Sequence, residues 1–140
     1  MLLRVILFVA VVTAVGGLLG CERSSRDMSQ DRPDLGSRDP TSIDLLVRGD
    51  KVAVITNTTA LMSLLRTGWA VDAHKCSIPG RMFLHYPEGT NDEIDILPGH
   101  KGTNYEFICA NGNFAVPRAA FLRSLASAGV DTNLIPRPPK

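Results

Sequence analysis

The chain has 140 residues, which is enough for one domain and too few for two of ordinary size. Its formal net charge is only +1, from 15 Lys and Arg against 14 Asp and Glu, which argues against nucleic acid as the main partner. Hydrophobic residues make up 44% of the chain, an ordinary value for a globular protein, but the first 20 residues are nearly all apolar.

Residues 1–20 have the parts of a secretory signal peptide: a positive charge at Arg4, an apolar stretch over residues 5–15 and a pair of glycines. They lead into Leu18-Leu19-Gly20-Cys21, which resembles the lipobox of bacterial lipoproteins. The resemblance implies that the Cys21 thiol receives a diacylglyceryl group and that the chain is cut before Cys21. It also implies that the new amino terminus is acylated, for example with palmitate.

The alternative is an uncleaved membrane helix over residues 5–21, whose 17 residues lie at the lower limit of the roughly 17–25 that span a bilayer. Both interpretations place residues 22–140 outside the cytoplasm. In the lipoprotein family, Asp directly after the Cys tends to keep the protein on the inner membrane. Glu22 stands at that position, so the resemblance favours the outer membrane of a bacterial cell envelope.

The next segment, residues 21–40, is predicted to be the lipidated Cys and a flexible tether. Nine of residues 22–40 are charged, with alternating signs, and only Met28 and Leu35 are large and apolar. Such a segment cannot offset the entropy cost of becoming ordered. Residues 41–140 then form a single globular domain.

The first half of this domain predicts two short strands and a helix. Residues 43–47 and 52–55 are strand-like runs on either side of a turn. A helix is expected over residues 58–67, with Asn57 or Thr56 as N-cap and Gly68 as the glycine that ends it. A further strand is expected near residues 71–77.

The second half predicts a run of antiparallel strands followed by a helix. Pro79-Gly80 suits a type II turn, and strands are expected over residues 81–86, 94–97 and 105–110. Asn111-Gly112 favours a two-residue type I′ hairpin that places Cys109 opposite Phe114 and Phe107 opposite Val116. In that hairpin Tyr105, Phe107, Cys109, Phe114 and Val116 share the core face.

The last helix is expected to begin at Pro117 and to end at Gly129, with Val130 packing back on Leu125. The order of elements predicts an α+β fold. We expect a small antiparallel sheet of about five to seven strands with two helices packed on one face.

Cys76 and Cys109 remain as an even pair once Cys21 is lipidated, so a disulfide is expected in an exported domain. Two separate buried thiols are the plain alternative. A metal site is the other, because His74, Cys76, His85, His100 and Cys109 are residue types that zinc accepts. Their spacing matches no familiar zinc motif, so we expect neither metal nor cofactor.

Few residues point to catalysis, because the chain has no Gly-x-Ser-x-Gly motif and no phosphate-binding glycine loop. No catalytic residue is assigned. Asp92, Glu93 and Asp95 are expected to form a solvated strand edge. His100 and Lys101, flanked by glycines, mark a possible interaction loop over residues 98–104, and loop 87–93 is expected at the opposite end of the sheet.

These observations predict a non-enzymatic, lipid-anchored cell-envelope protein whose small domain acts by contact with another envelope component. The alternative is a ligand-binding, hydrolytic or metal-dependent domain that uses His100, His74 and His85. Convergence of these histidines in one pocket would favour that alternative.

Overall fold

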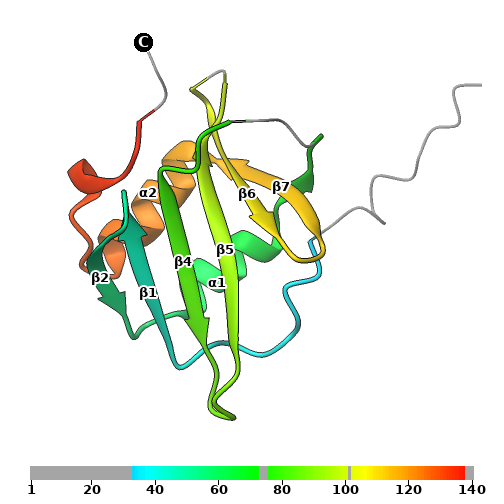
Figure 1. Cartoon of the computed structure of the whole chain (residues 1–140), viewed down its shortest axis with the longest axis vertical. Helices are drawn as coiled ribbons and strands as arrows, with labels where there is room; N and C mark the ends of the chain where they lie inside the picture. The colour runs from blue at the N-terminus through cyan, green and yellow to red at the C-terminus, as the bar shows by residue number, and fades with distance from the viewer. Residues whose placement is uncertain (1–32, 73–75, 101, 138–140) are drawn as a thin grey trace, which may run out of the picture.

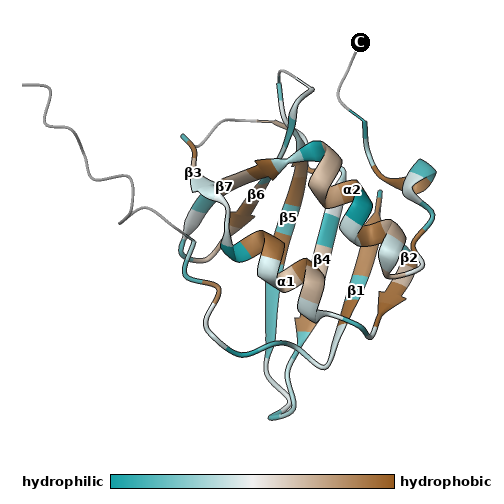
Figure 2. Cartoon of the chain, turned by 180° about the vertical axis from the view of Figure 1, so that it is seen from behind, coloured by the Kyte–Doolittle hydropathy of each residue, from teal (hydrophilic) through white to brown (hydrophobic). Residues whose placement is uncertain are grey.

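The computed structural model describes residues 33–72, 76–100 and 102–137. The predictions for the signal peptide, the lipobox and Cys21 therefore lie outside the described residues. Within the described ranges, one antiparallel sheet has seven strands in the order β2-β1-β4-β5-β6-β7-β3. Figures 1 and 2 show both helices on the same face of this sheet, so the predicted α+β class is confirmed.

The elements follow one another as two strands, a helix, five strands and a helix. The strands are β1 (Ser42–Val47), β2 (Asp50–Ile55), β3 (Trp69–Ala70), β4 (Gly80–His85), β5 (Asn91–Pro98), β6 (Asn104–Cys109) and β7 (Gly112–Pro117). The helices are α1 (Thr59–Arg66) and α2 (Arg118–Ser127), with a short 3₁₀ helix, η1 (Thr132–Leu134), near the C-terminus.

The core lies between the helices and the sheet, because alternate residues of each strand point to the helix side. The helices contribute five buried apolar side chains to the core: Leu61, Met62, Leu65, Phe121 and Leu125. The strands contribute a set of fully buried apolar side chains: Ile43, Leu45, Met82, Leu84, Ile94, Ile96, Tyr105, Phe107, Phe114 and Val116. Phe107 stacks on Phe114 and meets Phe121 edge-on, with ring centroids 5.0 and 5.1 Å apart.

The β6–β7 hairpin has a different register from the one predicted. Cys109 pairs with Gly112 and Phe107 pairs with Phe114, so the turn residues are Ala110 and Asn111. Asn111 is not among the described residues with positive φ, which a type I′ turn would require. Each residue of β6 thus pairs with a β7 residue two positions earlier than predicted. Because side chains alternate between the two faces, a shift of two residues leaves each one on its predicted face, and the predicted core face is confirmed.

The beginning and end of α1 also differ from the prediction. Its N-cap is Thr58, whose side chain does not cap the helix. Gly68 does not have the positive φ of a helix-ending glycine. It is needed for space, since a Cβ there would lie 2.6 Å from Cδ2 of Phe114. Gly80 was predicted to lie in a type II turn, but it is the first residue of β4. A Cβ on Gly80 would lie 3.2 Å from Cβ of Ile96, so the absence of a side chain gives room here as well.

The end of α2 is as predicted. Gly129 has φ of +83°, its N–H donates to the carbonyl of Ala126, and the N–H of Val130 donates to the carbonyl of Leu125 at 3.0 Å. These two bonds make a Schellman cap, which turns Val130 into the core. At the other end Pro117 is the N-cap and Arg118 begins the helix. The strand expected near 71–77 is wrong for the described residues of that range, since residues 71, 72, 76 and 77 are not in a strand; residues 73–75 lie outside the described ranges. The two-residue β3 lies just before this range, at Trp69–Ala70.

Candidate functional site

The sheet face that points away from α1 and α2 carries no helix in the described part of the chain (Figure 1). We call it the open face. The strand registers place on it the side chains that alternate with the core residues. A sheet that is covered on one side only is normally polar on the other, so the composition of this open face is informative.

A cluster of charges lies at the centre of the open face. Nε of Arg81 donates to Oδ1 of Asp95 at 2.8 Å and is 2.9 Å from Oε1 of Glu93. The hydrogen bond to Asp95 is the main reason that the pKa of Arg81 is raised. The sequence had suggested only a solvated acidic edge here, because it does not show that Arg81 of β4 faces Asp95 of β5.

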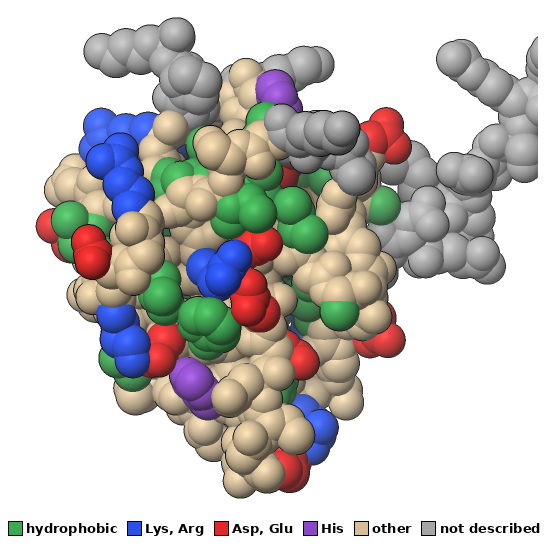
Figure 3. Space-filling model, viewed as in Figure 1, with side chains coloured by type: hydrophobic (Ala, Val, Ile, Leu, Met, Phe, Trp, Pro, Cys, Tyr) green, Lys and Arg blue, Asp and Glu red, His purple; other side chains and the backbone are tan. Residues whose placement is uncertain are grey.

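Apolar side chains surround this cluster, as the green groups in Figure 3 show. Val54 and Ile78 are exposed to 56% and 43%, and the side chains of Leu46, Phe83 and Ile108 are half-buried. Leu46, Ile78 and Arg81 also line a shallow hollow with the turn at Arg48. The centre of the open face therefore carries apolar side chains beside the charged ones, a mixture that a protein interface also has.

A second cluster of polar side chains lies toward the edge of the open face. Oδ2 of Asp44 is 2.6 Å from Nζ of Lys51 and 3.2 Å from Nε2 of His85. Hydrogen bonding to Lys51 is the largest cause that holds the pKa of Asp44 below its usual value. Nδ1 of His85 is 2.8 Å from the side-chain oxygen of Asn91. Both ring nitrogens of His85 therefore have polar neighbours, which is typical of a histidine with a structural role.

The hairpin loop after β4 and the loop after β5 lie at opposite ends of the sheet (Figure 1), as predicted. His100 is in the second loop, exposed, and its Nε2 lies 3.5 Å from Sγ of Cys76. The topology therefore keeps His85 and His100 apart. Lys101 and His74 lie outside the described residues. Among the residues that are described, no group of three or more His, Cys, Asp or Glu could hold a metal ion.

The structure differs from the predicted disulfide, because Cys76 and Cys109 are both free thiols. Cys76 lies beside His100, next to the loop that precedes β6, whereas Cys109 is the last residue of β6. Sγ of Cys109 donates to the carbonyl of Gly112 at 3.2 Å. The strand separates the two residues by about 16 Å, at roughly 3.3 Å per residue, which is too far for a bridge.

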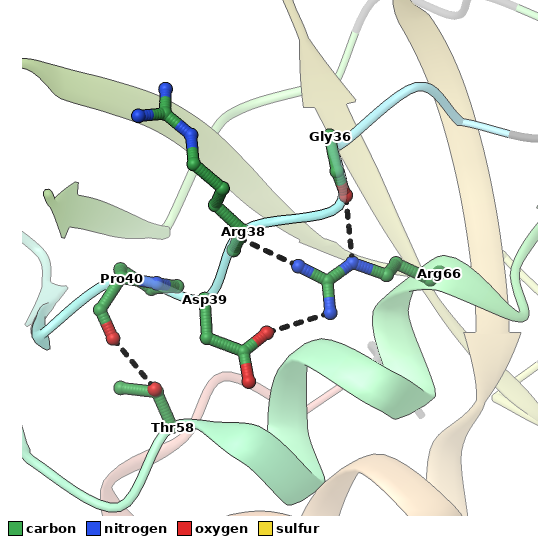
Figure 4. Close-up of polar contacts among 6 residues, drawn as sticks. All are labelled: Gly36, Arg38, Asp39, Pro40, Thr58 and Arg66. Carbon is green, nitrogen blue, oxygen red and sulfur yellow. Dashed lines mark hydrogen bonds and ion pairs between the residues drawn. The ribbon is translucent and has the colours of Figure 1, made fainter.

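Residues 33–40, which the sequence assigned to the flexible tether, are docked on the domain. We call this segment the strap. Figure 4 shows Arg66 of α1 reaching it at three points and Thr58 at a fourth. The signal missed in the sequence was Leu35, the apolar residue that packs against the core. Residues 33–40 are therefore packed on the domain that was predicted to start at residue 41.

No described helix is long and apolar enough to cross a membrane. No family model, no curated protein and no solved structure matches this chain.

Proposed function

We propose that this protein is anchored to the bacterial cell envelope through a lipid on Cys21 and that its domain acts by binding another envelope protein, without catalysing a reaction. The anchor follows from the resemblance of Leu18-Leu19-Gly20-Cys21 to a lipobox. Glu22 favours the outer membrane. Several acyl chains on Cys21 give a stable attachment, since one chain alone binds only marginally.

The open face is the observation that supports a binding function. Leu46, Phe83 and Ile108 lie near the ion pairs of Arg81, and interfaces are enriched in aromatic side chains and in Arg. Arg81 is 41% exposed at its side chain, so its guanidinium still has donors that a partner can use.

The chemistry of this face favours a protein over other partners. Acidic side chains beside Arg81 and Lys51 repel the phosphates of nucleic acid. A bilayer is disfavoured because inserting the central ion pairs would remove charged groups from water. A partner protein can cover the apolar residues of the open face and also form hydrogen bonds and ion pairs with its charged cluster.

In-cell photocrosslinking tests this proposal. A photoreactive residue is placed at Val54 or at Ile78 on the open face, and at Arg123 on the exposed side of α2 as the matched control. We expect one discrete protein adduct from each open-face position and none from Arg123. Equal adducts from Arg123, or no adduct from either open-face position, would contradict the proposed contact.

A further inference from the structure

The strap is held mainly by one side chain. Nε of Arg66 donates to the carbonyl of Gly36 at 2.9 Å, and its two terminal nitrogens donate to the carbonyl of Arg38 and to Oδ1 of Asp39, both at 2.7 Å. Figure 4 shows the guanidinium lying among these three acceptors. Only the five-donor fork of Arg can satisfy three separated acceptors at once, so Lys is not equivalent.

Other contacts hold the strap at both ends. At its C-terminal end the buried Thr58 hydroxyl donates to the carbonyl of Pro40 at 2.7 Å. At its N-terminal end the side-chain amide of Asn111 donates to the carbonyl of Asp34 at 3.0 Å. Because Asn111 lies in the β6–β7 turn, the N-terminal end of the strap lies beside that turn.

The middle of the strap contacts the β4–β5 hairpin. Arg38 forms an ion pair with Glu88 in the hairpin loop, and its guanidinium lies 5.8 Å from the centre of the Tyr86 ring. Thr41, which follows the strap, donates to the carbonyl of His85 from both its N–H and its hydroxyl. The strap thus runs along one end of the sheet, the end formed by residues 86–90 and the β6–β7 turn (Figure 1).

We propose that the docked strap fixes where the lipid anchor leaves the domain, so that this end of the sheet faces the membrane. The opposite end, with His100 and the β1–β2 turn, then points away from the membrane. The orientation rests on the proposed lipid anchor, whereas docking of the strap does not.

The length of the remaining tether supports this orientation. With the strap docked, the flexible tether predicted from the sequence shortens to residues 21–32, and a flexible chain of that length has an r.m.s. reach of about 19 Å. A tether of residues 21–40 would reach about 25 Å. The eight residues of β5 span about 26 Å along the strand. The shorter tether keeps the strap end of the domain closer to the membrane than a tether of residues 21–40 would, and in the proposed orientation the other end lies about a strand's length further out.

Limited proteolysis of the full mature chain tests docking without reference to the lipid. An endoprotease that cuts before Asp has sites at Asp34 and Asp39 in the strap and at Asp27 and Asp31 in the predicted tether, of which Asp39 and Asp31 are compared first. We expect cleavage at Asp39 to be at least about tenfold slower than at Asp31, since it requires local opening. Arg66→Ala and Arg66→Lys should both remove this protection, whereas Arg123→Ala, at an exposed arginine of α2, should not.

Equal cleavage at the two sites in the wild-type chain would overturn the strap proposal and leave the lipid anchor unaffected. If Arg66→Ala loses the fold, as seen by circular dichroism, Asn111→Ala replaces it. That variant removes only the contact with Asp34, and we expect faster cleavage at Asp34 with Asp39 still protected. Unchanged cleavage at Asp34 would contradict the strap's N-terminal contact.

Orientation is measured on the lipidated chain in nanodiscs of phosphatidylethanolamine and phosphatidylglycerol with nitroxide-labelled headgroups. We expect stronger broadening of the amide signals of Gly89 and Gly112, at the strap end, than of Gly49 and Gly102, at the opposite end. Equal broadening at both ends, with Asp39 protected from cleavage and lipid present on Cys21, would overturn the orientation alone. Absence of lipid on Cys21 would instead overturn the proposed function.

Discussion

Gly68 and Phe114 approach so closely that a Cβ on Gly68 would lie 2.6 Å from Cδ2 of the Phe114 ring. The same Cβ would be 2.9 Å from the carbonyl oxygen of Ala115. Gly68 connects α1 to β3, which pairs with β7, so this contact sets how near the helix lies to the edge of the sheet.

Gly68→Ala is therefore expected to lower the free energy of unfolding by about 1–3 kcal/mol through overpacking. The measurement is urea denaturation of the purified domain. Phe114→Leu removes the ring edge that the new methyl group meets, so the double variant should be more stable than the sum of the two single losses predicts. Strict additivity of the two losses would show that the ring is not the cause.

The two described cysteines differ in accessibility, so their thiols should react at different rates. Cys76 is exposed, and Cys109 is half-buried with its thiol donating to Gly112. We expect a maleimide to label Cys76 at least about tenfold faster than Cys109, because labelling of Cys109 requires the turn to open. The single variants Cys76→Ser and Cys109→Ser show which labelling rate belongs to which thiol. Disulfide-linked Cys76 and Cys109 peptides in a digest without reductant would contradict the free thiols of the structure.

Asp44 should make stability depend on acid pH. Its carboxylate pKa is lowered in the folded state, mainly by the hydrogen bond from Lys51 and also by His85. A lowered pKa stabilises the fold above the unfolded value of about 3.9, and this stabilisation disappears as pH falls through the folded value.

Asp44→Asn should therefore cost about 1 kcal/mol at pH 7 and progressively less below about pH 4. Unfolding midpoints in urea at pH 7 and pH 3 provide the test, with Asp50→Asn at the exposed start of β2 as the control. A loss of equal size at both pH values would mean that the charge of Asp44 is not involved.

The loop at His100 should be dispensable for folding and important for contact. The double variant His100→Ala with Lys101→Ala is expected to change stability by no more than about 0.5 kcal/mol, as usual for exposed loops. We expect it to weaken the crosslinks formed from Ile78, which lies two residues from Cys76, the neighbour of His100. Crosslinks at the wild-type level would show that the loop is only a connection.

Much of the fold could be predicted because the local patterns and the final packing agree. The stripe of Leu61 and Leu65 and the glycine at 129 mark α1 and the end of α2 without any long-range information. In the β6–β7 hairpin, alternation placed Phe107 and Phe114 on the core face even though the turn residues were wrong. A two-residue error in register leaves the faces unchanged.

The parts that could not be predicted depend on residues far apart in the chain. The docking of the strap depends on Arg66, whose partners lie about thirty residues earlier and are two backbone carbonyls and one carboxylate. The centre of the open face depends on the pairing of β4 with β5, which brings Arg81 to Asp95. Composition showed charge in both segments, but no local pattern showed which charges would meet.

Attachment to the envelope by a lipid on Cys21 underlies the whole proposed function. Intact mass spectrometry of the protein purified from bacterial membranes tests it most directly, with Cys21→Ser as the matched variant. We expect a chain that has lost residues 1–20 and gained the mass of acyl groups, and an unprocessed precursor for Cys21→Ser. A wild-type chain that keeps Met1 and carries no lipid would contradict it.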